Sequence, residues 1–163
     1  MPSYRIRPAT AGDVGFLTDV VFTATQAQGR FPDGLDEQQW RTDFAQWTRE
    51  QLLGGVQEST TSVIEVDDEP AGRLRTVTTA DSIELAGIQL LPCFQRHGVG
   101  TAVIEGLKAQ AAALGIPVDL DVEKDNPDAR KLYDHLGFIQ VGETEQEYKL
   151  RWVPPAGGGR GAC

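Results

Sequence analysis

Short alternating runs and longer runs with a three-to-four residue spacing divide this chain into strands and helices. Apolar residues that alternate with polar ones predict half-buried strands, whereas apolar residues at every third or fourth position predict amphipathic helices. The runs expected to form strands cover residues 4–7, 60–66, 71–78, 82–91, 118–123, 138–141 and 147–152. The first helix is expected to follow a cap at 10–13, with Val14, Leu17, Val20 and Val21 at helical spacing. The other helices are expected at 35–53, at 99–114 and from Asn126 to Gly137.

The resulting order, β-α-α-β-β-β-α-β-α-β-β, predicts an α/β fold with a mixed sheet and flanking helices. No internal repeat or linker interrupts this order, so residues 1–153 are expected to form a single domain. The segment 154–163 is rich in Pro and Gly and is expected to be disordered. In the second helix, Trp40, Phe44 and Trp47 follow one another at helical spacing, and this aromatic stripe is expected to pack in the core.

The segment between the fourth strand and the third helix is a turn that contains two glycines, Gln95-Arg96-His97-Gly98-Val99-Gly100-Thr101. A turn that leads from a strand into a helix points free backbone N–H groups at one spot, where the helix dipole also favours a negative charge. Gly98 and Gly100 carry no side chain, so a bulky anion can approach the main chain closely. Gln95, Arg96 and His97 could add side-chain donors, and the turn therefore suits a phosphate.

Two familiar phosphate-binding loops do not match this turn. A nucleoside-triphosphate loop needs a lysine after its second glycine, and a dinucleotide loop needs a third glycine at a fixed spacing. The remaining pattern, Gln-x-x-Gly-x-Gly after a strand, resembles the acyl-CoA pyrophosphate loop of the GNAT superfamily of N-acetyltransferases. One strand further on, a second segment closely resembles another signature of that family, Asn126-x-x-Ala129-x-x-Leu132-Tyr133-x-x-Leu136-Gly137-Phe138.

This resemblance implies the GNAT fold, in which two central parallel strands splay apart around the pantetheine arm of acetyl-CoA. It implies that the main chain of Leu90 and Leu91 bonds to that arm. Asn126 would reach the far side of the arm, although it also suits a simple helix cap. The pyrophosphate would bind to the loop residues Gln95, Arg96, His97, Gly98, Val99, Gly100 and Thr101.

Acetyl transfer to an amine needs a base, because an alkyl ammonium with a pKa of about 10.4 is almost entirely protonated at neutral pH. By resemblance the base is Glu84, which stands eleven residues before Gln95 as the base glutamate of the histone-modifying members does. The alternative for Glu84 is a solvent-facing strand carboxylate. Asp121 and Glu123 on the next strand are competing bases, and many family members use no single base.

The leaving thiolate needs a proton, and Tyr133 matches the position of the family's tyrosine. A phenol is protonated at neutral pH and can give its proton to sulfur. The alternative is a core aromatic residue with its hydroxyl at the edge of the pocket. By resemblance, the main-chain N–H of Leu90 would stabilise the oxyanion that forms during transfer.

Composition narrows the partners and the location. With 15 basic and 24 acidic residues the net charge is −9, so binding to a nucleic-acid backbone is not expected. No apolar run reaches the length of a membrane span and the N-terminus lacks a secretory pattern, so the protein is expected to be cytoplasmic. Its cysteines and histidines show no metal-binding spacing, so no metal is expected. Cys93 is expected to pack beneath the loop, with an acyl-carrying thiol as the alternative.

The expected function is therefore transfer of an acetyl group from acetyl-CoA to a primary amine of a small molecule or peptide, by direct attack in a ternary complex. The alternative is a non-catalytic acyl-CoA or metabolite sensor with the same fold. No motif identifies the acceptor, although the first two helices commonly shape its pocket in the family and one ring of the aromatic stripe could line it. Homodimers are common in the family, and the strand edge at Trp152 could form one.

Overall fold

The computed structural model describes residues 3–54 and 58–155, and the chain divides into two compact units. The first unit consists of Met1–Thr76 and Gly87–Gly100, and the second consists of Val77–Ala86 and Thr101–Cys163. The expected order of elements is confirmed, with short 3₁₀ turns added before the first and third helices. The expectation of a disordered tail falls, from residue 156 onward, outside the described residues.

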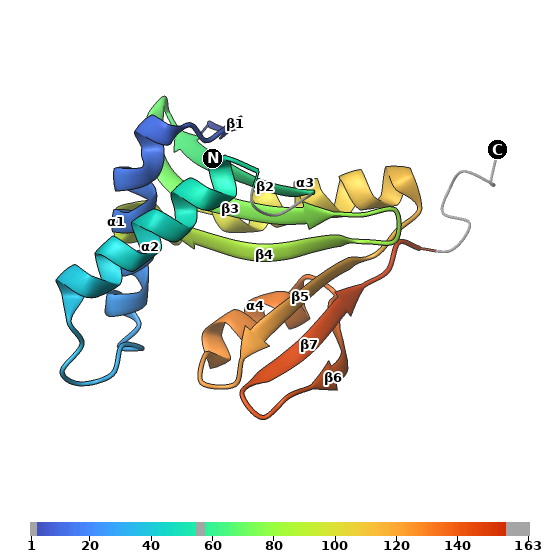
Figure 1. The fold of residues 1–163 in the computed structure, drawn as a ribbon. Coiled ribbons are helices and arrows are strands. Elements are labelled where there is room, and N and C mark those ends of the chain that lie inside the picture. Colours follow the sequence, from blue (N-terminus) through green and yellow to red (C-terminus); the bar gives the residue numbers. More distant parts are fainter. Residues whose placement is uncertain (1–2, 55–57, 156–163) are drawn as a thin grey trace. The chain divides into compact units, whose positions relative to one another are not determined.

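The first unit combines an antiparallel strand pair with two helices. The strands β1 (Tyr4–Pro8) and β2 (Ser59–Val66) pair from Tyr4 opposite Val66 to Pro8 opposite Ser62. The turn η1 (Ala11–Asp13) leads into α1 (Val14–Ala27), which contacts α2 (Glu37–Leu52), as Figure 1 shows. Fully buried side chains from α1 and β2 form the core of this unit: Leu17, Val20, Val63 and Ile64.

Two strands and one helix have residues in both units. They are β3 (Glu69–Thr78), β4 (Ile83–Leu90) and α3 (Val99–Leu114), and the turn η2 (Pro92–Phe94) lies between β4 and α3. Hydrogen bonds order the strands as β1-β2-β3-β4-β5-β7-β6, which confirms the mixed sheet.

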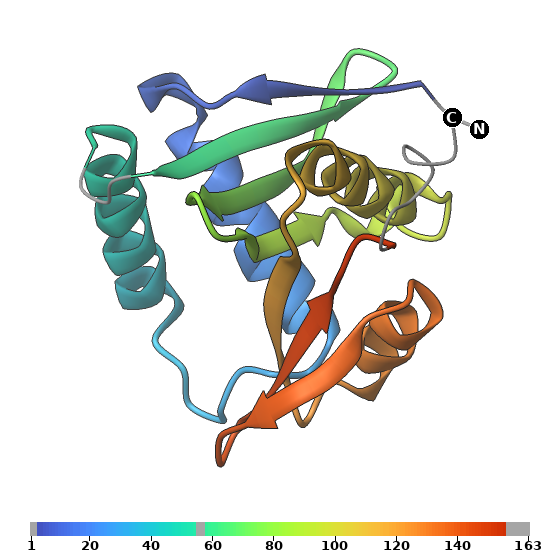
Figure 2. The same ribbon diagram turned by 90° about the vertical axis from the view of Figure 1, so that its right-hand side faces the viewer.

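The second unit holds the parallel part of the sheet and its C-terminal strands. Here β4 pairs in parallel with β5 (Val118–Glu123) through Ile83 opposite Val118 and Glu84 opposite Asp119. The helix α4 (Pro127–His135) is followed by β6 (Ile139–Glu143) and β7 (Glu147–Trp152). Figure 2 shows β5, β7 and β6 as neighbouring antiparallel strands. Alternation buries Val118, Leu120 and Val122 on one face of β5.

Two sequence-based expectations about burial are wrong. The aromatic stripe of α2 is not core, because Trp47 exposes 38% of its surface and Thr48 is the one buried residue of that helix. The stripe instead stacks along the helix, with Trp40 and Phe44 nearly parallel and their ring centroids 5.1 Å apart. Cys93 does not pack beneath the loop, because the η2 turn places it at the surface.

Candidate functional site

The segment between β4 and α3 is held by its own backbone as a tight turn in the first unit. The N–H of Phe94 donates to the carbonyl of Leu91 at 2.9 Å, and the N–H of Gln95 donates to the carbonyl of Pro92 at 3.2 Å. The Gln95 side chain turns back and donates from Nε2 to the carbonyl of Leu90 at 3.0 Å. This side chain therefore braces the loop onto the end of the strand that precedes it.

The backbone after Gln95 presents unpaired donors at the start of α3. Arg96 and Gly98 have φ values of +64° and +83°, a conformation that glycine adopts without strain. Within the described part of the chain, the N–H groups of Arg96, His97 and Gly98 make no backbone hydrogen bond. The first N–H groups of α3 add further orphan donors and the positive end of the helix dipole. This geometry suits an anion such as a pyrophosphate.

The space next to Gly100 is open, as a bound anion would need. A side-chain carbon added at Gly100 would meet only Leu90 Cδ1, at an ordinary contact distance of 3.9 Å. The protein's own packing therefore does not require glycine at this position. Val99 is buried and anchors the helix start, while the side chains of Arg96 and His97 are exposed. Thr101, the next expected phosphate contact, is the first residue of the second unit after this loop.

Leu90 and Leu91, which precede the loop, differ in which of their main-chain groups are already hydrogen-bonded. The N–H of Leu91 donates to the carbonyl of Ala71 at 2.9 Å, and its carbonyl accepts from Phe94. The carbonyl of Leu90 accepts from the Gln95 side chain. Each carbonyl keeps a second lone pair, so a cofactor arm could still bond to either one, but the Leu91 N–H is already used.

In the second unit, Asn126 caps the N-terminus of α4. Its Oδ1 accepts from the N–H of Ala129 at 3.3 Å, and Pro127 occupies the first helical position, where no N–H is needed. The capping role that the sequence suggested for Asn126 is thus confirmed. Its contact with a cofactor stays a prediction.

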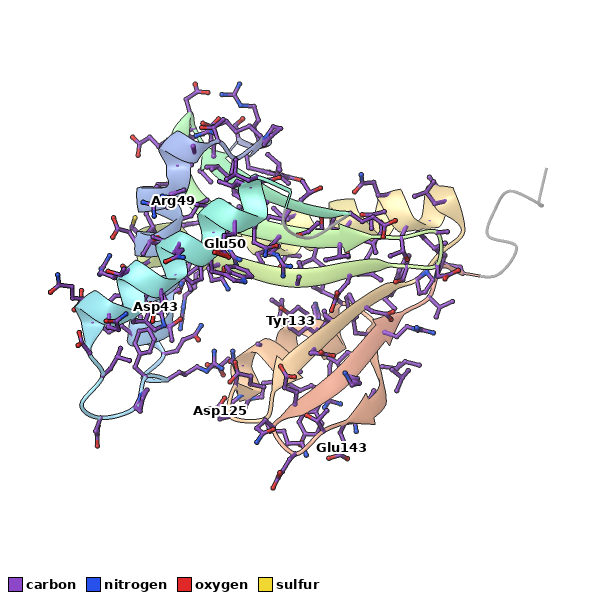
Figure 3. All side chains as sticks on the ribbon, viewed as in Figure 1. Asp43, Arg49, Glu50, Asp125, Tyr133 and Glu143 are labelled. Atoms are coloured by element: carbon purple, nitrogen blue, oxygen red, sulfur yellow. The ribbon has the colours of Figure 1, made fainter. Side chains whose placement is uncertain are left out.

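Tyr133 lies on α4 and is half-buried, where Figure 3 labels it. Its ring meets the buried ring of Phe138 edge-on, with centroids 5.8 Å apart. Burial raises the pKa of the Tyr133 phenol above its ordinary value of 10.0. The hydroxyl therefore keeps its proton at neutral pH, which is the state that a proton donor to a thiolate requires.

Glu84 is exposed on β4 and lines a pocket of about 320 Å³ within the second unit. The neighbouring acids of that pocket have basic partners, since Asp119 pairs with Arg151 at 2.6 Å and Asp121 pairs with Lys149 at 3.4 Å. Glu84 forms no ion pair within residues 3–54 and 58–155. Of these three carboxylates, Glu84 is the one without a basic partner among the described residues.

A cluster that the sequence did not single out lies in the first unit, around two arginines of β3. Arg73 is buried, exposing 5% of its surface, and its guanidinium carbon lies 5.5 Å from the Phe44 ring centroid. Arg75 lies 5.2 Å from the Trp47 ring centroid. The sequence signal was the alternation Arg73-Leu74-Arg75 within a strand, which places both guanidinium groups on one face.

Across the parts of the chain that the structure describes, no cluster of His, Cys, Asp and Glu side chains could hold a metal ion. Within those parts, too, no helix combines the length and apolar character that a membrane span requires.

Comparison with known proteins places this geometry among acetyltransferases. The family model for the Acetyltransferase (GNAT) family matches residues 22–138. The PaiA N-acetyltransferase of Thermoplasma acidophilum, solved in complex with coenzyme A, is similar with a TM-score of 0.75 and 17% identity, covering 93% of this chain and 99% of that one.

Two further solved structures share the fold. The ribosomal-protein-S18-alanine N-acetyltransferase of Escherichia coli has a TM-score of 0.67 and 20% identity, covering 96% of this chain and 98% of its own. The spermidine/spermine N-acetyltransferase SpeG of Vibrio cholerae has a TM-score of 0.65 and 16% identity, covering 92% and 93%. Their different acceptors leave the acceptor of this chain open.

Proposed function

Because the chain belongs to the acetyltransferase (GNAT) family, we propose that it transfers an acetyl group from acetyl-CoA to a primary amine. The observation that carries the proposal is the loop at residues 95–100, where N–H groups without a partner among the described residues, together with room for a further atom at Gly100, suit the pyrophosphate of coenzyme A. The coenzyme A in the Thermoplasma structure supports the same donor. The main chain of Leu90 and Leu91 and the side chain of Asn126 are proposed to contact the pantetheine arm, and Thr101 is proposed to contact the pyrophosphate.

The proposed reaction is a direct transfer. The neutral amine attacks the thioester carbonyl carbon, a C–N bond forms, the C–S bond breaks, and the coenzyme A thiolate leaves. The N–H of Leu90 donates to the developing oxyanion, and the Tyr133 hydroxyl gives its proton to the thiolate. The proton released by the amine goes to Glu84, directly or through water, because Asp121 is engaged with Lys149.

Tyr133→Phe tests the chemistry. Loss of a positioned proton donor should lower kcat about 100-fold, while the Kd for acetyl-CoA stays unchanged. Tyr148→Phe is the matched control, because Tyr148 is a tyrosine of the same unit whose ring lies beneath Lys124 and Arg130. Release of free thiol across a panel of amines is the measurement. Unchanged turnover in Tyr133→Phe removes Tyr133 from the mechanism.

Gly100→Val tests the loop separately from the chemistry. The branched side chain fills the open space at the start of α3, so binding of acetyl-CoA should weaken by at least about tenfold, measured by calorimetry. Gly15→Val is the matched control, because Gly15 is a helical glycine of α1 with no atom within 4 Å of an added side-chain carbon. Tight acetyl-CoA binding with no acetylation of any amine would instead indicate a sensor of acyl-CoA.

A further inference from the structure

Arg73 and Arg75, together called the arginine site, are two cations with no anion. Neither forms an ion pair with any carboxylate in the described ranges 3–54 and 58–155. The Nε atoms of both side chains are buried and make no hydrogen bond to any residue of these ranges. Among the described residues, the side chains of this pair make one hydrogen bond, from Arg73 Nη1 to Gln89 Oε1 at 3.0 Å. Since an unsatisfied buried charge is costly, a pair left in this state calls for an explanation.

The acidic residues of α2 that stand close in sequence to Phe44 and Trp47 do not neutralise the arginine site. Figure 3 shows Asp43, Arg49 and Glu50 along this helix. Asp43 accepts a hydrogen bond from Gln39 at 2.9 Å, and Glu50 accepts one from Gln46 at 3.5 Å. The α2 residues that do face the arginines are the rings of Phe44 and Trp47. An aromatic ring holds a guanidinium in place but leaves its N–H donors free for an anion.

Gly87 on β4 leaves space for the side chain of Arg73. A side-chain carbon added at Gly87 would lie 2.6 Å from Arg73 Nη1, so the guanidinium occupies the space that a side chain at residue 87 would fill. On the opposite face of β3, a carbon added at Gly72 would lie 2.4 Å from the Gln89 carbonyl oxygen and 3.3 Å from Leu90 Cα, so the two strands approach closely there. Gln89, which accepts the hydrogen bond from Arg73 Nη1, directly precedes Leu90 on β4. The arginine site therefore lies in the first unit, one residue along β4 from the residue proposed to stabilise the oxyanion.

From this arrangement we propose that the arginine site binds a carboxylate of the acceptor, so that the substrate is a primary amine that also carries a carboxylate. This inference rests on the proposed acetyl transfer and specifies its substrate class. Guanidinium groups bind carboxylates through paired N–H donors, and the half-buried Arg75 has terminal nitrogens that make no hydrogen bond within the described residues and can supply such donors. Burial lowers the pKa of Arg73 to about 10, which still leaves it charged at neutral pH. Arg75 is less buried than Arg73 and lies nearer to solvent.

The test uses matched amines that differ in the carboxylate. Phenylalanine is compared with phenethylamine and with phenylalaninamide, and a peptide with N-terminal aspartate is compared with its asparagine counterpart. The first set tests an α-carboxylate and the second a side-chain carboxylate. The wild-type enzyme should favour the carboxylate member of at least one set about 100-fold in kcat/KM, because a buried polar site left unpaired discriminates strongly.

Arg73→Gln and Arg75→Gln should each remove most of that preference through a rise in the acceptor KM, with the KM for acetyl-CoA unchanged. Arg73→Lys should restore part of it, since a lysine keeps the charge but not the paired donors. Gly87→Ala keeps both arginines but displaces the Arg73 guanidinium, and it should weaken the preference in the same way. Arg49→Gln, at an exposed arginine of the same helix as Trp47, is the control and should behave as wild type.

Two results overturn the inference: no preference for carboxylate amines, or a preference that survives in each of Arg73→Gln, Arg75→Gln and Gly87→Ala. If Arg73→Gln fails to fold, the Arg75→Gln and Gly87→Ala results decide. Failure of the proposed acetyl transfer shows itself differently, as no thiol release with any amine. In that case calorimetry of the same carboxylate amines, with coenzyme A present, decides the inference: binding lost in Arg75→Gln supports it, and absence of binding overturns it.

Discussion

Arg7 and Arg73 are both strand arginines of the first unit, but their surroundings are opposite. Arg7 donates from Nε to Glu65 at 2.8 Å and from both terminal nitrogens to Asp13 at 2.9 Å. These carboxylates raise the pKa of Arg7, whereas burial and the nearby Arg75 lower the pKa of Arg73. The ion pairs of Arg7 therefore stabilise the fold. Arg73 has no carboxylate partner among the described residues and is available to a ligand.

The comparison makes a first prediction at Arg7. Arg7→Met leaves Asp13 without its bidentate partner and Glu65 with Arg5 alone, so the free energy of unfolding should fall by about 2–3 kcal/mol. Urea unfolding at pH 7 measures the change. Lys149→Met, which removes a more exposed ion pair with Asp121, is the control and should cost below about 1 kcal/mol. Equal losses in the two variants would show that the Arg7 network is not specially stabilising.

Lowering the pH should weaken the ion pair between Arg7 and Asp13. Arg7 lowers the pKa of Asp13 from 3.8 to about 2, so the folded state favours the charged carboxylate. This contribution to stability is complete above about pH 4 and disappears as the pH falls towards 2, through the folded pKa. At pH 7, Asp13→Asn should cost about 1–2 kcal/mol in urea unfolding, and the difference from wild type should shrink at pH 3. A difference that is constant with pH would contradict the ion-pair explanation.

Replacing Arg73 should have a smaller effect on the free energy of unfolding, and this effect should be stabilising. Arg73→Met removes a buried charge that has no counter-ion in the described part of the chain, but it also loses the hydrogen bond to Gln89 and the contacts with the rings of Phe44 and Trp47. The cost of burying the guanidinium charge outweighs these contacts, so the free energy of unfolding without ligand should rise by about 0.5–1 kcal/mol. The midpoint of urea unfolding at pH 7 measures this. A loss above 2 kcal/mol would assign Arg73 a structural role like that of Arg7.

Local patterns in the sequence account for most of the fold. The helix at 99–114 and the strands at 118–123 and 147–152 match the structure residue for residue, because alternation and helical spacing act over a few neighbours. The loop at 95–100 was predictable for the same reason, since a strand, two glycines and a helix follow one another directly. The capping role of Asn126 was also predictable from local sequence, because Pro127 follows it directly.

The arginine site could not be predicted, because it depends on which helix covers which face of β3. Alternation alone assigns Arg73 and Arg75 to a face opposite Leu74, and charged residues on such a face are normally solvated. The rings of α2 cover that face, and they are only partly buried because they stack on one another and on the arginines. The same missing information explains why Trp47 was expected in the core and Cys93 beneath the loop.

The close approach of β3 and β4 at Gly72 restricts how this protein can diverge. A methyl group there would press into the main chain of Gln89, so even alanine is excluded unless the strands move. A mutational library aimed at new acceptors would thus find residue 72 invariant, while the flexible side chains at 73, 75 and 47 remain free to vary. The range of substrates can therefore change during evolution while the backbone contact at Gly72 stays the same.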